Sequence, residues 1–170
     1  MGVLVEAISV VVPVRVLEEL YPGGVQGYAR DCPNGTYCSD GSLTRVGFMV
    51  PADVEAFLEH LAGFGLVSFD GARCIDMAVV DQRQGPTARC DWCEFGVHRL
   101  GFSVAWLKGT SASPMAAPPG WTVERARSIR FAPAEERAGR FLRLARKTGV
   151  EIYLDFRTGR EVYVGRVYRG

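Results

Sequence analysis

Residues 5–13 read Val-Glu-Ala-Ile-Ser-Val-Val-Val-Pro, and this stretch decides the fold more than any other. β-Branched residues dominate it, which is typical of a β-strand, and Pro13 ends the pattern because proline has no N–H to donate. Its near-continuous hydrophobicity predicts a central strand that is covered on both faces. We therefore expect the first strand of a sheet over residues 5–12.

Helical spacing appears directly after this strand. Apolar residues recur over 16–21 and stop at Pro22-Gly23-Gly24, and a second short helix is expected over 25–29. A longer amphipathic helix is predicted over 54–61, where apolar residues lie at i, i+3, i+4 and i+7.

Extended segments alternate with these helices. Residues 31–42 are dense in turn formers, and the Asp40-Gly41 pair predicts a hairpin that joins a short strand over 36–38 to a strand over 43–50. A further strand is expected over 74–81.

Residues 1–81 thus have the order strand, helix, strand, strand, helix, strand, which is that of a ferredoxin-like βαββαβ unit. The sequence predicts an α+β fold with a mostly antiparallel sheet and helices on one face. A competing interpretation groups the 54–61 helix with the strands after it as the βαβββ half of a vicinal-oxygen-chelate-type domain. The chain has only two histidines, His60 and His98, and no pattern that places that family's metal ligands.

The rest of the chain extends this fold. Two more strands are expected over 94–97 and 102–107, followed by a loop over 108–120 that holds three prolines. An extended segment over 121–131 and a hairpin over 151–167 are predicted to flank a C-terminal helix. The apolar face of that helix comprises Ala134, Ala138, Phe141, Leu142 and Ala145.

We expect one domain over residues 1–170. The alternative is two sub-lobes, 1–107 and 121–170, joined by the loop 108–120.

Composition sets limits on the class of protein. The chain is 48% hydrophobic and 23% charged, which is ordinary for a globular protein with a real core. No apolar run is long enough to cross a bilayer, and the N-terminal segment carries Glu6 without a basic leader, so no membrane partner is expected. The five cysteines are an odd number, which argues against a secreted disulfide framework and favours a cytoplasmic location.

Charge is unevenly distributed. Residues 1–120 hold 8 Lys and Arg against 13 Asp and Glu, and residues 121–170 hold 12 against 6. The first part is therefore −5 and the last part +6. A basic C-terminal third raises the hypothesis of nucleic-acid binding, although no recognition motif accompanies it.

The sharpest local motif is Cys90-Asp91-Trp92-Cys93. A CxxC pair brings two sulfurs together in a turn, where they can bind a metal or form a redox disulfide. A structural zinc site would add Cys32 and Cys38, with His98 as an alternative ligand. The competing interpretation is that the cysteines are separate small buried side chains.

Carboxylates gather near the ends of predicted strands. If they face one cleft, the candidates for acid–base catalysis are Asp81, Asp91 and Glu94 together with His98. Solvated turn residues explain the same pattern. The glycine-containing polar loop 81–87, next to Trp92 and two thiols, is where we expect a binding site.

Three functions follow as hypotheses. The first is a non-enzymatic binding or accessory module for a protein partner or a small ligand. The second is a metal- or thiol-dependent enzyme that uses the Cys90–Cys93 region. The third is a nucleic-acid binder whose C-terminal helix presents the basic side chains Arg137, Arg140, Arg143 and Lys147.

A homodimer formed by pairing of sheet edges or faces is an expected assembly, because a sheet of this kind has open edges.

Overall fold

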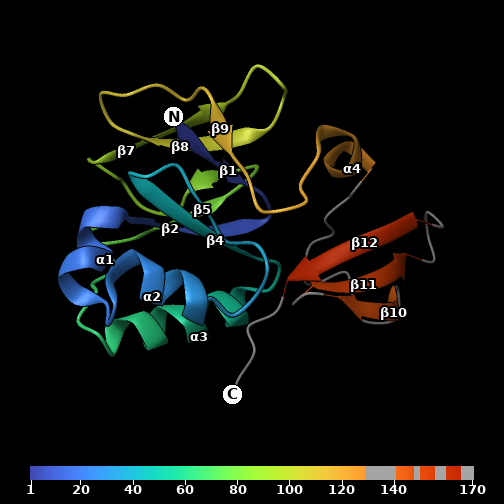
Figure 1. Ribbon diagram of the computed structural model, residues 1–170, viewed down its shortest axis with the longest axis horizontal. Coiled ribbons are helices and arrows are strands. Elements are labelled where there is room, and N and C mark those ends of the chain that lie inside the picture. The colour runs from blue at the N-terminus through green and yellow to red at the C-terminus, as the bar shows by residue number, and fades with distance from the viewer. Residues whose placement is uncertain (129–140, 148–149, 156–159, 166–170) are drawn as a thin grey trace.

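The computed structural model describes residues 1–128, 141–147, 150–155 and 160–165 (Figure 1). Helices and mostly antiparallel sheets make up the described chain, so the α+β class predicted from the sequence is confirmed. The described residues contain no helix that is both long enough and apolar enough to cross a membrane.

A five-stranded sheet forms the middle layer. Its strands, in spatial order, are β3 (Cys38–Ser39), β4 (Leu43–Phe48), β2 (Ile8–Pro13), β5 (Ala78–Asp81) and β6 (Gly85–Pro86). All neighbouring pairs are antiparallel, and Val10 of β2 lies opposite Val46 on one side and Val79 on the other. The prediction of a central strand covered on both faces is confirmed for β2.

The predicted first strand is two strands in two sheets, which corrects the sequence-based boundary. β1 (Gly2–Val5) belongs to a second sheet, and the chain turns at Glu6 and Ala7 before β2 begins. Ala7 has a φ of 52°, in the left-handed region that few non-glycine residues adopt. The turn is held by Gln82, whose side-chain oxygen accepts the Ala7 N–H at 2.6 Å.

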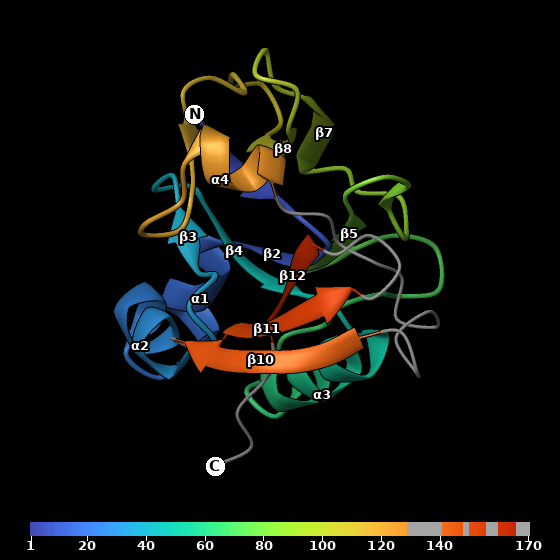
Figure 2. The same ribbon diagram turned by 90° about the vertical axis from the view of Figure 1, so that its right-hand side faces the viewer.

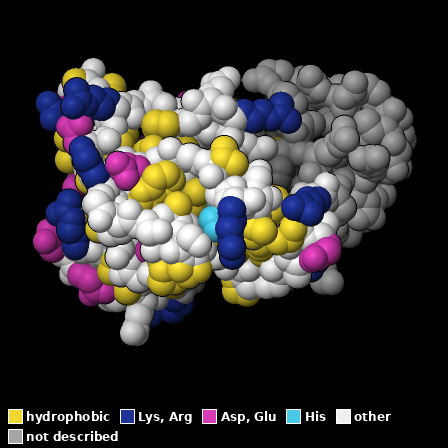
Figure 3. All heavy atoms as spheres, turned by 90° about the horizontal axis from the view of Figure 1, so that it is seen from above, with side chains coloured by type: hydrophobic (Ala, Val, Ile, Leu, Met, Phe, Trp, Pro, Cys, Tyr) yellow, Lys and Arg dark blue, Asp and Glu magenta, His cyan; other side chains and the backbone are white. Residues whose placement is uncertain are grey.

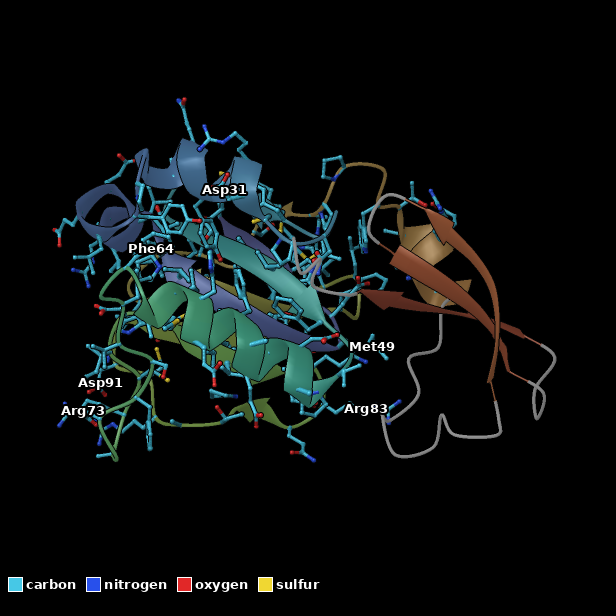
Figure 4. The ribbon with its side chains drawn as sticks, turned by 90° about the horizontal axis from the view of Figure 1, so that it is seen from below. Asp31, Met49, Phe64, Arg73, Arg83 and Asp91 are labelled. Carbon is cyan, nitrogen blue, oxygen red and sulfur yellow. The ribbon has the colours of Figure 1, made fainter. Side chains whose placement is uncertain are left out.

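Three helices cover one face of the middle sheet (Figures 1 and 4). They are α1 (Val14–Leu20), α2 (Gly24–Asp31) and α3 (Pro51–Ala62), close to the predicted segments. Their buried faces enclose one apolar core, in which Val10 and Val12 of β2 meet Leu17, Phe57 and Leu61 of the helices.

The second sheet covers the opposite face. It has the order β7 (Cys93–Val97), β8 (Ser103–Leu107), β1 and β9 (Met115–Ala116). Val11 of β2 points into this second core with Val3 and Val5 of β1. Helices, sheet and sheet thus form three layers (Figure 1).

The structure differs from two sequence-based expectations in this part of the chain. The predicted loop 108–120 contributes β9, which pairs in parallel with β1. The ferredoxin-like order is not confirmed, because the first strand is divided between two sheets and two helices, α1 and α2, follow it.

The C-terminal part differs most from the prediction. Residues 123–128 form the short helix α4 (Val123–Ser128) where an extended segment was expected. Residues 141–147 form the strand β10 (Phe141–Lys147) where a helix was expected, and residues 134–140 lie outside the described chain.

A three-stranded antiparallel sheet contains the predicted hairpin and has a strand where part of the C-terminal helix was predicted. β10 pairs with β11 (Val150–Asp155), which pairs with β12 (Arg160–Gly165), so the hairpin itself is confirmed (Figure 2). The apolar residues Leu142 and Leu144 also alternate with period two. Only two residues separate β10 from its partner strand β11. The pairing of these two strands overrides a weak helical preference.

This sheet also corrects the hypothesis of a basic recognition helix. Arg143 and Lys147 lie on β10, and Arg137 and Arg140 lie outside the described residues.

Candidate functional site

A hollow of about 260 Å³ opens between the edges of the two core sheets. It is lined by residues 80–86 of β5 and β6, residues 95–97 of β7, residues 103–104 of β8, and Val5 of β1. The loop 81–87 that the sequence singles out as a binding site therefore forms one wall of the hollow.

The turn between β5 and β6 is built by Asp81. Its Oδ1 accepts the backbone N–H groups of Arg83 at 2.7 Å and Gln84 at 2.9 Å, which folds the chain back on itself. Gly85 has a φ of 84°, so the turn requires a residue without a Cβ at that position. The carboxylate of Asp81 thus shapes the wall.

Gln82 ties this turn to the rest of the molecule. Its side chain accepts the Ala7 N–H, and its carbonyl oxygen accepts a hydrogen bond from Ser103 Oγ at 2.7 Å. Ala7 lies in the turn between β1 and β2, and Ser103 is the first residue of β8. The wall of the hollow is therefore fixed to β8 and to the β1–β2 turn.

The hollow is apolar on its inner side and polar at its rim. Val5, Val80 and Val104 are buried beneath it, and Val97 at its mouth is 74% exposed. The Arg83 side chain is exposed at the rim (Figure 4), and it makes no hydrogen bond or ion pair with any described residue. Such a surface offers contact area for an apolar group and a free cation beside it.

The structure separates the four acid–base candidates. Asp81 lines the hollow, whereas Asp91 lies between Arg73 Nη1 at 2.9 Å and Arg89 Nε at 2.8 Å. Hydrogen bonding to Arg89 is the main cause that lowers the pKa of Asp91.

The other two candidates have partners on the second sheet. Glu94 Oε2 accepts the Trp106 Nε1–H at 2.8 Å. His98 is 6% exposed, and its Nδ1 accepts the Leu100 N–H at 3.2 Å, while its Nε2 is buried without a hydrogen-bond partner among the described residues. Within the described chain no hydrogen bond or ion pair joins any two of Asp81, Asp91, Glu94 and His98.

The four cysteines considered as zinc ligands lie on different sides of the middle sheet. Cys32 packs against the helix-side core, and Cys38, Cys90 and Cys93 pack in or against the core between the sheets. All five cysteines are free thiols. The part of the chain that the structure describes holds no group of three or more His, Cys, Asp or Glu side chains arranged to hold a metal ion.

Burial makes two of these thiols harder to ionise. It raises the pKa of Cys32 to about 12 and that of Cys38 to about 11. A thiol with a raised pKa is a weaker nucleophile at neutral pH, because the thiolate is the reactive form.

The region of Cys90 contains a thiol that the zinc hypothesis omits. The thiol of Cys74 interacts with that of Cys90, as does the thiol of Cys93. An isolated parallel β-bridge between the backbones of Arg73 and Arg89 brings the two segments together. Cys74 lies 16 positions before Cys90 in the chain, and no local pattern relates them.

A second group missed at the sequence level surrounds Tyr21. Its hydroxyl donates to Asp31 Oδ2 at 3.3 Å and lies 3.5 Å from Nε2 of His60, the histidine that its helix exposes. Burial, followed by the charge of Asp31, raises the pKa of Tyr21 to about 12. Tyr21 directly follows α1, whereas Asp31 and His60 belong to α2 and α3, so helical spacing alone does not predict their contact.

Surface charge is mixed on the face seen from above. Figure 3 shows basic and acidic side chains interspersed there, with hydrophobic side chains in several separate groups. Comparison with protein-family models, curated proteins and solved structures finds no match for this chain.

Proposed function

We propose that this protein is a binding module for a small organic ligand with an apolar body and a carboxylate, which it receives in the hollow between β5–β6 and β7–β8. The single observation that supports this most directly is the hollow itself, because its lining combines apolar side chains with the polar turn between β5 and β6. The first hypothesis drawn from the sequence, a binding module, is kept in this narrower form.

Size and lining favour a small ligand. Ligand sites typically have volumes of about 300–1,000 Å³ and combine apolar walls with a few polar groups. A hollow of about 260 Å³ lies just below that range. The side chains of Val80, Phe95 and Val97 supply apolar contact, and Ser103 with the 82–85 turn supplies hydrogen-bonding groups.

Charge favours an anionic end. Arg83 is exposed at the rim without a partner among the described residues, and Asp81 on the same rim already accepts two backbone N–H groups. A guanidinium recognises a carboxylate through charge-assisted hydrogen bonds. The ligand's carboxylate is therefore placed beside Arg83 and its apolar body over Phe95 and Val97.

The test uses small carboxylates and their neutral amides as matched probes. Hexanoate, benzoate and 4-phenylbutyrate are titrated into the full chain by calorimetry, each beside the corresponding amide. We expect at least one carboxylate to bind more tightly than its amide. Val97→Asp should weaken that binding by about tenfold or more, because it places a charge against the apolar body.

Control variants separate the hollow from the rest of the surface. Arg83→Gln should weaken carboxylate binding by about threefold, as expected for an exposed charge pair, and should leave amide binding unchanged. Arg99→Gln and Val67→Asp alter exposed residues that do not line the hollow and should change neither. Binding that is equally sensitive to Val67→Asp and Val97→Asp contradicts the proposal.

A further inference from the structure

Three thiols from two separate segments meet at one place beside β7. Cys90 and Cys93 come from the CxxC segment, and Cys74 comes from the chain that precedes β5. The Cys74 N–H donates to the Arg89 carbonyl oxygen at 2.8 Å, which aligns the two segments. Arg73 and Arg89 form a parallel backbone β-bridge, so Cys74 and Cys90 follow it at adjacent positions, and both pack with Cys93 in or against the core between the sheets.

Exposure distinguishes the three sulfurs. Cys74 is 5% exposed and Cys93 is 3% exposed, whereas Cys90 is only partly buried. A molecule arriving from solvent therefore meets Cys90 first.

The pKa values of the three thiols also distinguish Cys90 from the other two. The neighbouring thiols of Cys74 and Cys93, together with the backbone N–H groups of Trp92 and Cys93, lower the pKa of Cys90. The proximity of Cys90 is in turn the main cause that raises the pKa values of Cys74 and Cys93. Cys90 is therefore the thiol of the three that ionises first, and the thiolate is the nucleophile in thiol–disulfide exchange.

We propose that Cys90 and Cys93 form a thiol–disulfide exchange site, in which Cys90 attacks a low-molecular-weight disulfide and Cys93 resolves the product. Cys74, whose thiol donates to the Ala88 carbonyl oxygen at 3.7 Å, lies beside Cys90 and is a positioning residue. The oxidant belongs to the class of small disulfides, for which glutathione disulfide is the probe. This site is separate from the hollow, so either inference can fail without the other.

The exchange balances in two steps. The Cys90 thiolate attacks one sulfur of the disulfide, forms a mixed disulfide and releases one small thiolate. The negative charge on Cys90 is then gone, which removes the main cause that kept Cys93 protonated. Cys93 loses its proton to the released thiolate and attacks Cys90 Sγ, which forms the Cys90–Cys93 disulfide and releases the second small thiolate. One small disulfide is reduced to two thiol equivalents as two protein thiols are oxidised.

The CxxC spacing favours Cys93 over Cys74 as the resolving residue. Asp91 and Trp92 form a bend between the two cysteines, so the covalent chain keeps their sulfurs together. Cys74 is held only through the pairing of its segment with Arg89. The proposal therefore commits to one disulfide.

The test treats the folded full-length protein with glutathione disulfide and follows it by intact-mass and peptide-mapping mass spectrometry. The wild type should lose two hydrogens and show a Cys90–Cys93 disulfide. Cys93→Ser should stop at a glutathione adduct on Cys90, and Cys90→Ser should show neither product. Cys32→Ser, which removes a thiol on the far side of the middle sheet, should behave as the wild type. Circular dichroism checks that each variant is folded.

A second measurement needs no variant. Alkylation of Cys90 by iodoacetamide at pH 6 should be at least about 10-fold faster in the folded protein than in the urea-unfolded chain, because little ordinary thiol is ionised at that pH. Equal rates in the two states overturn the proposal. So does a disulfide that maps to any other pair, or oxidation of Cys90→Ser at the wild-type rate.

Discussion

Gly47 on β4 should not tolerate a methyl group, because the guanidinium of Arg45 occupies the space. Arg45 is 2% exposed, and a Cβ built on Gly47 overlaps its Nη2 and lies 2.7 Å from its Cζ. The side chain of Arg45 is unable to move aside cheaply, since it donates to Ser9 Oγ at 2.8 Å, to the Thr36 carbonyl at 3.1 Å and to the Glu6 carbonyl at 2.8 Å.

The cost of Gly47→Ala has two parts. Forcing extra volume into a packed interior costs about 1–3 kcal/mol. Breaking the hydrogen bond between Arg45 Nη2 and the Glu6 carbonyl costs about 1.5–3 kcal/mol, because the donor is charged and buried. We therefore expect Gly47→Ala to lower the free energy of unfolding by about 2.5–6 kcal/mol, a large share of the 5–15 kcal/mol typical of a domain.

Urea unfolding followed by circular dichroism measures this loss. Gly96→Ala is the matched control, because its Cβ would meet the partly exposed ring of Trp106 at 3.1 Å and the ring can tilt. That control should cost no more than about 1 kcal/mol. In an Arg45→Met background the Gly47→Ala penalty should fall by at least about 1.5 kcal/mol, since the two residues are in contact. A Gly47→Ala penalty that is small, or unchanged in that background, refutes the reasoning.

Three further predictions concern the helix-side core and the cover of the second sheet. Leu17→Ala should cost about 2–5 kcal/mol of unfolding free energy because Leu17 is fully buried, whereas Leu20→Ala should cost at most about 0.5 kcal/mol because Leu20 is 39% exposed; urea unfolding compares them. The pKa of Tyr21 is raised to about 12, so its contribution to stability is fully present below about pH 10 and is lost as the pH rises through about 12. Tyr21→Phe should therefore flatten the fall in stability between those pH values, and an unchanged slope contradicts the assignment. Trp121→Phe removes the hydrogen bond from Trp121 Nε1 to Glu6 Oε1 at 3.0 Å and should cost about 1–2 kcal/mol, while Glu6→Gln keeps an acceptor and should cost less; chemical denaturation of both variants tests this.

The central strand shows what a sequence pattern can and cannot predict. The β-branched residues at position 8 and at 10–12 are enough to predict a strand covered on both faces, because a near-continuous run of this kind is typical of such strands. The break at Ala7 is not predictable in this way. It depends on a left-handed backbone conformation that is stabilised by Gln82, a residue 75 positions later in the chain.

The prediction of a C-terminal helix was wrong for a different reason. Over residues 141–147 the apolar positions fit both helical and strand spacing, and the choice is made by the pairing of β10 with β11. The hairpin of β11 and β12 was predictable because its turn and its alternation agree. The spacing of apolar residues identifies a helix or a strand only where it fits one of the two periodicities and not the other.

One wall of the hollow could be predicted from the sequence. The loop 81–87 is polar, contains glycine and follows a buried strand, which are general signs of a binding loop. The opposite wall, with Phe95 and Ser103, arises from the way two sheets pack. The same holds for Cys74, which reaches Cys90 through pairing between Arg73 and Arg89.

The proposal that the hollow binds a small carboxylate is tested most directly by nuclear magnetic resonance. The ¹⁵N-labelled chain is titrated with 4-phenylbutyrate and, separately, with its amide. The account predicts that backbone amide shifts caused by the carboxylate concentrate in residues 80–86, 95–97 and 103–104, and that Val97→Asp removes them. Shifts that concentrate elsewhere on the surface, or that persist unchanged in Val97→Asp, would contradict it.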